Sequence, residues 1–386
     1  MYPLFLIALV FATFVNTSLG AKIGFSNPLM ALFPMMIYLV VTVATKRMNY
    51  HKIAVFLLVL AVIILLFKFS IGQNYLIEVG RLLLIPMFMY ICYDHLTKKQ
   101  LSTLRYLFVA FYILLCVLAL VEKVLSRHFF PVSTDVEWLN SIGYFRSASL
   151  LWHPLANGFF VAFFMAYVAV TEFKKMYLQI GLFFLGYISL FCFDARGATI
   201  VVTLVVMPYF LLKLYKMAGN RRWLIVLGAI CMLGVLAYLV TKTSVGSGRL
   251  MNADVMDNSS QTRLDVFKFH KYYKSTDDFI WGHPDNYRFM MEALGAGGVE
   301  NGVITMILFY GIIFTPILLF LLFLLQYKSL SVYSRFDKWL LLIVFFGIGS
   351  MNPNLAIPLI WQLWIFTYFT FRPDPSEDKQ AWAFRL

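Results

Sequence analysis

Charged side chains are scarce in this sequence of 386 residues. Only 13% of the residues are Asp, Glu, Lys or Arg, whereas 61% are hydrophobic and 18% aromatic. A soluble domain carries about 25% charged residues, so the composition excludes an ordinary soluble protein. A membrane-spanning helix needs about 20 apolar residues, which leaves this chain room for about a dozen such helices and little else.

The sequence also lacks the residue patterns of metal sites and of common soluble enzymes. Its cysteines, Cys92, Cys116, Cys192 and Cys231, lie in apolar runs without CxxC or Cys/His ligand spacing. We interpret them as small buried hydrophobic residues rather than as disulfides or metal ligands. Nucleophile elbow, Walker loop, HExxH, GxGxxG and Asp-x-Asp motifs are absent, and we expect neither a metal nor another cofactor.

Twelve apolar runs are present instead, and they predict transmembrane helices. They cover residues 3–19, 28–45, 53–69, 75–93, 101–121, 151–171, 178–193, 198–215, 223–240, 302–325, 339–350 and 355–371. We read the first run as a helix rather than a signal peptide, because no Lys or Arg precedes it. The expected fold is an all-α polytopic membrane protein that forms a single domain over residues 1–386.

Lys and Arg outnumber Asp and Glu, so that the formal net charge is +13. These basic residues form no block on a soluble scaffold, and we expect no nucleic acid as partner. They collect in alternate connections, around residues 46–52, 98–105, 174–175, 213–222 and 328–338. Since Lys and Arg mark cytoplasmic loops, both termini are predicted to be cytoplasmic.

The opposite side of the membrane then carries one long polar loop, residues 241–301. A loop of this length is usually functional or disordered, but disordered segments are poor in aromatic residues. This one contains Phe267, Phe269, Tyr272, Tyr273, Phe279 and Trp281. We therefore expect a folded extracytoplasmic loop that covers a functional site.

Candidate site residues lie where apolar runs meet this outer side. Arg196 stands in a very short polar break, where an ionisable residue tends to face a cavity or a partner charge; an ion pair with Asp194 is the alternative. Arg146 precedes His153 and Asn157, which Pro154 places at the mouth of a helix. His153 can exchange a proton near neutral pH, or it can serve only as a capping residue.

Glu300 and Asn301 stand where the long loop enters the next apolar run. A carboxylate at a helix N-terminus is favoured by the helix dipole, so Glu300 can be a capping residue. Alternatively it is a general base, which must reach the hydroxyl that it deprotonates. The loop itself contributes Arg263 and His283 as further candidates.

Taken in order, these motifs resemble a known family. They are Arg146 followed by His153-Pro154-Leu155-Ala156-Asn157-Gly158, then Asp194-Ala195-Arg196-Gly197-Ala198, Thr262-Arg263-Leu264-Asp265, Trp281-Gly282, and Glu300-Asn301 before Gly311. This pattern is similar to that of the O-antigen ligase and O-antigen polymerase superfamily, over about 144–313. Each motif is short, and it is their order and common side of the membrane that carry the likeness.

The resemblance implies a metal-independent glycosyltransferase, with a fold like the C-type integral-membrane glycosyltransferases. Its donor is expected to be a glycan on undecaprenyl pyrophosphate. Arg196 and Arg263 would hold the pyrophosphate, with Arg146 as a third candidate and His153, Asn157, His283 and Asn301 as further substrate-binding residues. Ligases of the family resemble one another in carrying a His-Asn pair at the end of the loop. This chain has Glu300-Asn301 at that place, and this difference from the ligases favours a polymerase.

The expected function is therefore polymerisation of lipid-linked repeat units into O-antigen, capsular or exopolysaccharide at the bacterial inner membrane. Catalysis is expected from Glu300, Arg196 and Arg263 on the outer face. A flippase and a chain-length regulator are candidate protein partners. The alternatives are a ligase that transfers O-antigen to lipid A–core, and a repeat-unit flippase or transporter. A transporter is expected to show internal repeats and paired interrupted helices, and the sequence indicates neither.

Overall fold

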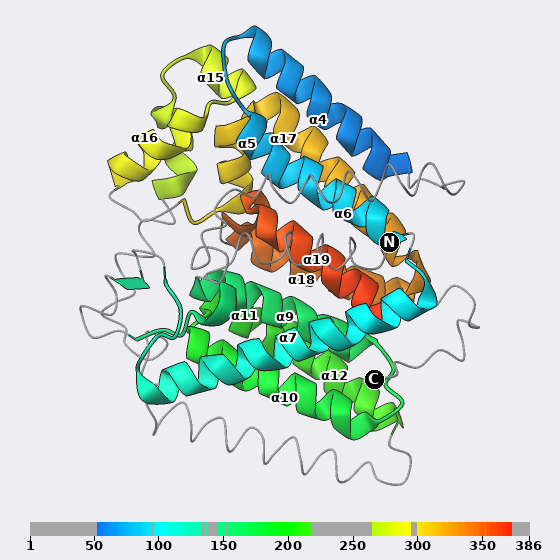
Figure 1. Ribbon diagram of the computed structural model, residues 1–386. Coiled ribbons are helices and arrows are strands. Elements are labelled where there is room, and N and C mark those ends of the chain that lie inside the picture. Colours follow the sequence, from blue (N-terminus) through cyan, green and yellow to red (C-terminus); the bar gives the residue numbers. More distant parts are fainter. Residues whose placement is uncertain are drawn as a thin grey trace. The chain divides into compact units, whose positions relative to one another are not determined.

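The computed structural model describes residues 52–94, 96–132, 136–137, 145–151, 153–217, 265–294, 299–351 and 353–372. These residues are mostly helical (Figure 1). Five of the described helices have the length and composition to cross a membrane, namely Lys52–Ser70, Lys99–Leu125, Met176–Phe193, Arg196–Lys216 and Gly302–Val332. Shorter apolar helices are Leu82–Asp94, Pro154–Val170 and Leu359–Phe371.

The predicted apolar runs coincide with helices wherever the structure describes them. Three predicted runs, at 3–19, 28–45 and 223–240, lie outside the described residues. Cys92, Cys116 and Cys192 are buried, as predicted, whereas Cys231 lies outside the described part of the chain.

The chain divides into two compact units. Unit 1 combines residues 1–108, 261–333 and 349–372, and unit 2 combines residues 109–260, 334–348 and 373–386. Both units are thus assembled from segments that lie far apart in the sequence. Helix α7 (Lys98–Leu125) passes from the first unit into the second.

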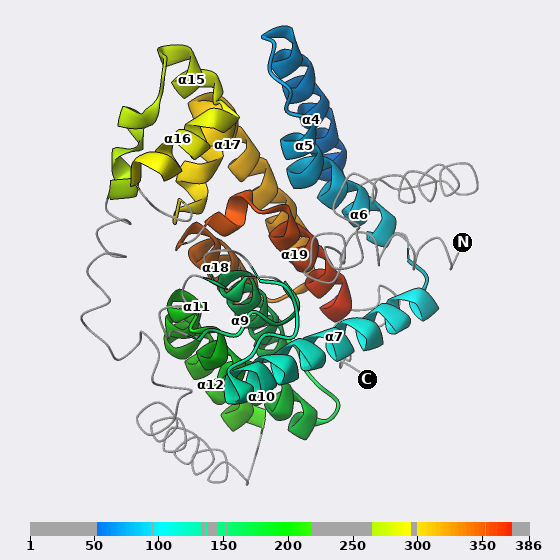
Figure 2. The same ribbon diagram turned by 60° about the vertical axis from the view of Figure 1, so that its left-hand side comes forward.

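Unit 1 contains the long loop and the helices that carry it. Its described elements are α4 (Lys52–Ser70), α5 (Leu76–Val79), η2 (Gly80–Leu84), α6 (Ile85–Asp94), η7 (Val266–Tyr272), α15 (Thr276–Trp281), α16 (Pro284–Leu294), α17 (Gly302–Ser329), η8 (Leu330–Val332), η9 (Pro353–Ala356) and α19 (Pro358–Phe371). Helices α15 and α16 pack against α17, and α4 packs against α17 as well (Figures 1 and 2). The described part of the loop is therefore folded, as its aromatic residues predicted.

The core of unit 1 is aromatic. The ring of Tyr90 on α6 stacks on Trp364 and Tyr368 of α19, with centroids 6.0 and 6.3 Å apart. At the end of α19, Arg105 donates to the carbonyl groups of Thr370 and Arg372. Cations at a helix C-terminus bind its unpaired carbonyls and stabilise the helix dipole, so α19 is held at both its side and its end.

Unit 2 is built around a helix that is apolar on every side. Its described elements are most of α7, η3 (Ser149–Leu151), α9 (Pro154–Val170), α10 (Met176–Phe193), α11 (Arg196–Val201), η4 (Val202–Val206), α12 (Met207–Met217) and most of α18 (Arg335–Met351). From Ala156 onward every residue of α9 is buried. A helix that is hydrophobic all round belongs in the interior, and α9 accordingly contacts α10, α11 and α12.

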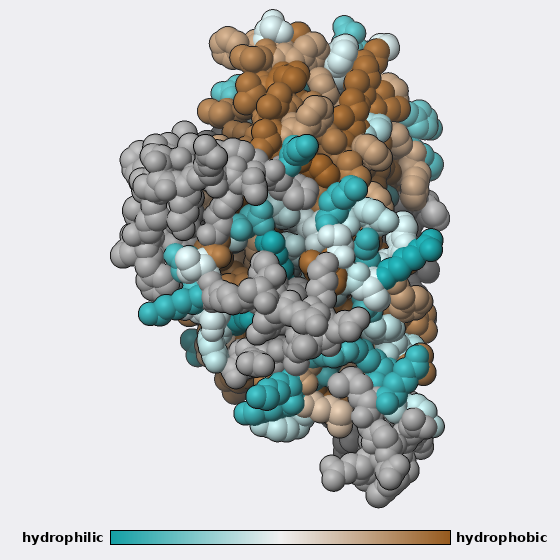
Figure 3. Space-filling model, turned by 90° about the vertical axis from the view of Figure 1, so that its right-hand side faces the viewer, coloured by the Kyte–Doolittle hydropathy of each residue, from teal (hydrophilic) through white to brown (hydrophobic). Residues whose placement is uncertain are grey.

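The outer surface of α4 is strongly apolar. Phe56, Ile63, Leu66 and Phe69 are between 51% and 80% exposed. Figure 3 shows a broad hydrophobic surface at the level at which α4 lies in Figure 1. Soluble proteins rarely expose such contiguous apolar patches. Together with the five long apolar helices, this surface identifies an all-α membrane protein.

Candidate functional site

Arg146 holds the turn that joins α10 to α11 in unit 2. Its guanidinium donates to the carbonyl oxygens of Phe193 and Asp194, each at 3.2 Å, and Nε lies 4.0 Å from Asp194 Oδ2. The backbone N–H of Ser147 adds a bond of 3.0 Å to the carbonyl of Cys192. Arg146 and Ser147, which precede α9, thus bind the C-terminal end of α10. A cation is expected to bind helix-end carbonyls in this way.

The held turn is strained and contains a buried carboxylate. Asp194 adopts the left-handed conformation, with φ of 49°, and is only 6% exposed. Its Oδ1 has no hydrogen-bond partner among the described residues. Non-glycine residues in this conformation are uncommon and tend to gather at functional sites. The left-handed conformation suits Asp194 as the C-cap of α10, so it is the buried Oδ1 that helix capping does not explain.

Arg196 follows directly as the first residue of the membrane helix Arg196–Lys216. Its side chain is half-buried. The N-terminus of a helix carries partial positive charge and unpaired N–H groups, so it favours anions. A guanidinium at this end adds a full charge and a planar set of donors. Arg196 and Arg146 are thus brought to the same turn between α10 and α11.

The end of α7 anchors this segment from the other side, and the sequence interpretation had missed it. Buried Glu122 accepts N–H bonds from Ala148 at 3.0 Å and Ser149 at 2.9 Å. Buried Lys123 donates to the carbonyl of Phe145 at 2.9 Å. The available signal was two charged residues immediately after an apolar run, but nothing in the sequence indicated what they would bind.

Asn157 and Gly158 connect the start of α9 to the same place. Asn157 is fully buried, and its amide donates to the carbonyls of Ala148 and His153. A β-carbon at Gly158 would lie 2.2 Å from that of Ala195, so glycine permits α9 to approach the turn before Arg196. Asn157 was predicted to bind substrate, and in the structure its amide nitrogen joins two parts of the protein.

His153 caps α9, which begins at Pro154 as predicted. Its Nδ1 accepts a hydrogen bond of 3.1 Å from the backbone N–H of Leu155. An accepting Nδ1 carries no proton, so the neutral ring has its proton on Nε2. Of the two interpretations of His153, proton exchange and helix capping, the structure shows the capping contact.

His283 repeats this arrangement at the start of α16 in unit 1. Its Nδ1 accepts from the N–H of Asp285 at 3.2 Å, and Pro284 follows it at the first helical position. The backbone N–H of His283 donates to the carbonyl of Leu308 in α17 at 3.0 Å. The histidine therefore fixes both the direction of α16 and its attachment to α17.

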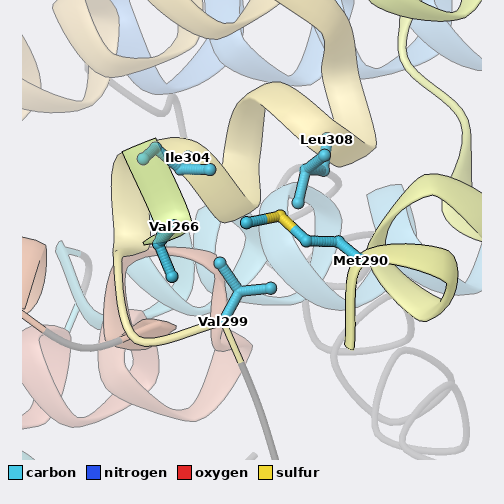
Figure 4. Close-up of a cluster of buried hydrophobic side chains, with 5 residues drawn as sticks. All are labelled: Val266, Met290, Val299, Ile304 and Leu308. Atoms are coloured by element: carbon cyan, nitrogen blue, oxygen red, sulfur yellow. The ribbon is translucent and has the colours of Figure 1, made fainter. Parts of the chain in front are cut away.

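A small hydrophobic cluster holds the folded part of the loop on α17. Figure 4 shows the side chains of Val266, Met290, Val299, Ile304 and Leu308 pointing toward one another. All five are at most 4% exposed. Burial raises the pKa of nearby Tyr273 and Tyr287, so both phenols remain neutral at physiological pH. The loop helices are thus part of the packed structure of unit 1.

Asn301, rather than Glu300, caps α17. Its side-chain oxygen accepts from the N–H groups of Val303 at 3.1 Å and Ile304 at 3.0 Å. Asn301 was predicted to bind substrate, and this contact gives its oxygen a local role. Glu300 is half-buried and precedes the N-cap residue by one position. The capping role that was one interpretation of Glu300 therefore belongs to Asn301.

The predicted site residues thus fall into separate groups. Arg146, His153, Asn157 and Arg196 belong to unit 2, whereas His283, Glu300 and Asn301 belong to unit 1. Arg263 lies outside the described residues. Within the residues that the structure describes, no three His, Cys, Asp or Glu side chains gather closely enough to hold a metal ion.

What this arrangement can do chemically follows from its charges. Unit 2 offers two guanidinium groups, and unit 1 offers a half-buried carboxylate where the loop returns to α17. Arginine binds phosphate oxygens through two parallel N–H bonds and remains charged at any working pH.

Comparison of the chain with protein-family models, curated proteins and solved structures finds no match.

Proposed function

We propose that the protein is a glycosyltransferase of the bacterial inner membrane that polymerises oligosaccharide repeat units linked to undecaprenyl pyrophosphate. The product would be an O-antigen of lipopolysaccharide, a capsule or an exopolysaccharide. The observation that carries the proposal is Arg196 at the N-terminus of a membrane helix, on a turn that Arg146 holds. A charged, bidentate donor in that place suits a pyrophosphate attached to a membrane lipid.

In the proposed reaction a sugar hydroxyl of the acceptor repeat unit attacks the anomeric carbon of the donor glycan. The new glycosidic C–O bond forms as the C–O bond to the pyrophosphate breaks. Arg196 and Arg263 stabilise the charge that develops on the leaving pyrophosphate, and Glu300 takes the proton from the attacking hydroxyl. Arg146 acts through its backbone contacts, because its guanidinium already binds the carbonyls of Phe193 and Asp194.

The proposal places these residues on the outer face of the membrane, with both termini in the cytoplasm. It rests on the resemblance of the motifs and on the distribution of Lys and Arg between connections. A flippase would deliver the lipid-linked units to that face, and a chain-length regulator would be a further partner.

One observation favours the alternative of a repeat-unit transporter. Helix α17 is interrupted at Gly311, where φ is 75° and ψ is 173°. Interrupted membrane helices are typical of transporters, which carry them in matched pairs. Among the described residues α17 is the only long apolar helix with such a reversal of φ, so the second member of a pair is not found there.

Deletion of the gene in its host, followed by analysis of the surface glycan, tests the proposal. A polymerase defect leaves single repeat units on the surface, and a ligase defect leaves free lipid-linked polymer. Single lipid-linked units that accumulate in the cytoplasm would identify a transporter and contradict polymerisation. The purified protein in liposomes should also form polymer from lipid-linked repeat units without an added metal.

A further inference from the structure

The interruption of α17 exposes carbonyl groups that other parts of unit 1 bind. Carbonyls that precede a break lose the N–H partners of the following turn, which is costly in a membrane. The carbonyl of Leu308 accepts the backbone N–H of His283 at 3.0 Å. The carbonyl of Phe309 accepts the hydroxyl of Tyr75 at 2.8 Å. The break is therefore satisfied partly by the loop itself.

The loop turn Trp281–Gly282 lies directly on this break. Gly282 and Gly311 both have positive φ, of 77° and 75°. A β-carbon on Gly282 would lie 2.4 Å from the nitrogen of Gly311, and one on Gly311 would lie 2.2 Å from the carbonyl oxygen of Ile280. Two backbones thus meet where only glycine leaves room for them.

Lys68, near the end of α4, fastens this turn from the other side. It is fully buried, although it is charged. Its Nζ donates to the carbonyls of Trp281 and Gly282, the latter at 2.7 Å, and lies 4.3 Å from the centroid of the Tyr75 ring. Within the described residues no carboxylate lies within ion-pair distance of it. Two backbone carbonyls, the side-chain oxygen of Gln73 at 3.3 Å and the Tyr75 ring contact its charge, and Asp278 adds an electrostatic attraction from a longer distance.

Aromatic packing surrounds the same junction. The rings of Phe67, Trp281 and Phe314 contact one another, with centroids 4.6, 5.7 and 6.0 Å apart. These residues come from α4, from the loop turn and from the part of α17 beyond the break. The lysine is consequently enclosed in a dry environment, where its hydrogen bonds to carbonyls are strong.

We propose that Lys68 is a positioning residue that fastens the Trp281–Gly282 turn of the loop onto the break in α17. Through this contact it holds α15 and α16 against the start of α17, next to Glu300. The expected effect of Lys68 on polymer formation rests on the proposed function. Its role in docking the loop onto α17 is independent of that function.

Hydrogen exchange of the full-length protein in lipid nanodiscs tests the docking. Lys68→Met leaves two buried carbonyls without a donor, a loss that corresponds to roughly tenfold to a hundredfold faster exchange over residues 276–294. Lys68→Arg retains charge and donors and should restore protection. Lys52→Met, at the exposed start of the same helix, is the matched control and should leave exchange unchanged.

The proposal is overturned if Lys68→Met leaves residues 276–294 protected. It is also overturned if residues 154–193 of unit 2 exchange faster to the same extent, since that would show general destabilisation. If Lys68→Met does not fold, Lys68→Gln is judged by the same criteria. Tyr75→Phe, which removes only the hydroxyl bond to Phe309, should accelerate exchange less than Lys68→Met does.

Polymer formation by the same variants then tests positioning separately. Lys68→Met is expected to form polymer roughly tenfold more slowly, mainly through a higher KM for the acceptor, and Lys68→Arg should recover it. Faster exchange with unchanged kinetics would refute the positioning role. If the wild-type protein forms no polymer, the proposed function fails, and exchange alone decides whether Lys68 docks the loop.

Discussion

Both units use a cation to hold a turn at the end of a helix, and this cation is half-buried in unit 2 and fully buried in unit 1. In unit 2, Arg146 binds the carbonyls of Phe193 and Asp194 after α10. In unit 1, Lys68 binds the carbonyls of Trp281 and Gly282, the last residue of α15 and its C-cap. In both cases the cation comes from a distant part of the sequence, and it satisfies the unpaired carbonyls that every helix end exposes.

The two turns differ in what lies beside the cation. Arg146 has a carboxylate 4.0 Å away, and the turn that it holds leads into a helix that starts with Arg196. The ammonium group of Lys68 contacts carbonyls, an amide and an aromatic ring, and Asp278 acts on it only from beyond ion-pair distance. A buried cation therefore does not by itself indicate a ligand site. The second guanidinium at a helix N-terminus is what makes the unit 2 turn the candidate for anion binding.

The largest expected effect tests whether unit 1 supplies the proton acceptor. Glu300→Gln preserves size but removes the base, so polymer formation should fall by about 10²–10⁴-fold. Glu292→Gln, which removes only the exposed carboxylate paired with Arg288, is the control. An active Glu300→Gln variant, together with an inactive His153→Gln or His283→Gln variant, would assign the base to that histidine.

The next effect tests the anion site of unit 2. Arg196→Lys retains the charge but loses the planar pair of donors, and we expect polymer formation to fall by roughly 10²-fold. Arg288→Lys, in the exposed pair with Glu292, should behave like the wild type. Membrane abundance should be equal in all variants. Near-normal polymer from Arg196→Lys would show that Arg196 is a membrane anchor rather than a phosphate ligand.

A smaller effect distinguishes holding the turn from binding the ligand. Arg146→Gln leaves the carbonyls of Phe193 and Asp194 without their charged donor, which should cost about 1–3 kcal/mol of stability. Thermal unfolding of the purified protein measures this loss. If Arg146 only holds the turn, stability and activity should fall together. A large loss of activity with unchanged stability would instead assign Arg146 to the pyrophosphate.

The smallest expected effect concerns the two His-Pro pairs, one in each unit. His153 and His283 both cap a helix through Nδ1, and loss of such a cap typically costs about 1 kcal/mol. His153→Ala and His283→Ala should therefore lower stability by similar amounts, as measured by unfolding in detergent. Polymer formation by His153→Gln and His283→Gln should exceed that of Glu300→Gln. Unequal stability losses would show that one histidine does more than cap.

Much of the fold follows from local properties of the sequence. The position of each apolar run predicts where a helix lies, and every run in the described residues is mainly helical. Pro154 starts α9 because its ring suits the first helical turn. Arg146 and Arg196 were both predicted as site residues, and unit 2 brings them to one turn.

Contacts between distant residues could not be read in this way. Lys68 and Gly282 are 214 positions apart, and no spacing rule connects such residues, because their approach depends on how whole helices pack. The sequence by itself determined which of the described segments are helical and that the protein is a membrane protein, since composition and length suffice for both. Only the tertiary structure decided that Glu122 binds the segment before α9 and that α17 breaks beneath Gly282. Each of these depends on which backbone groups remain unpaired once the helices are packed.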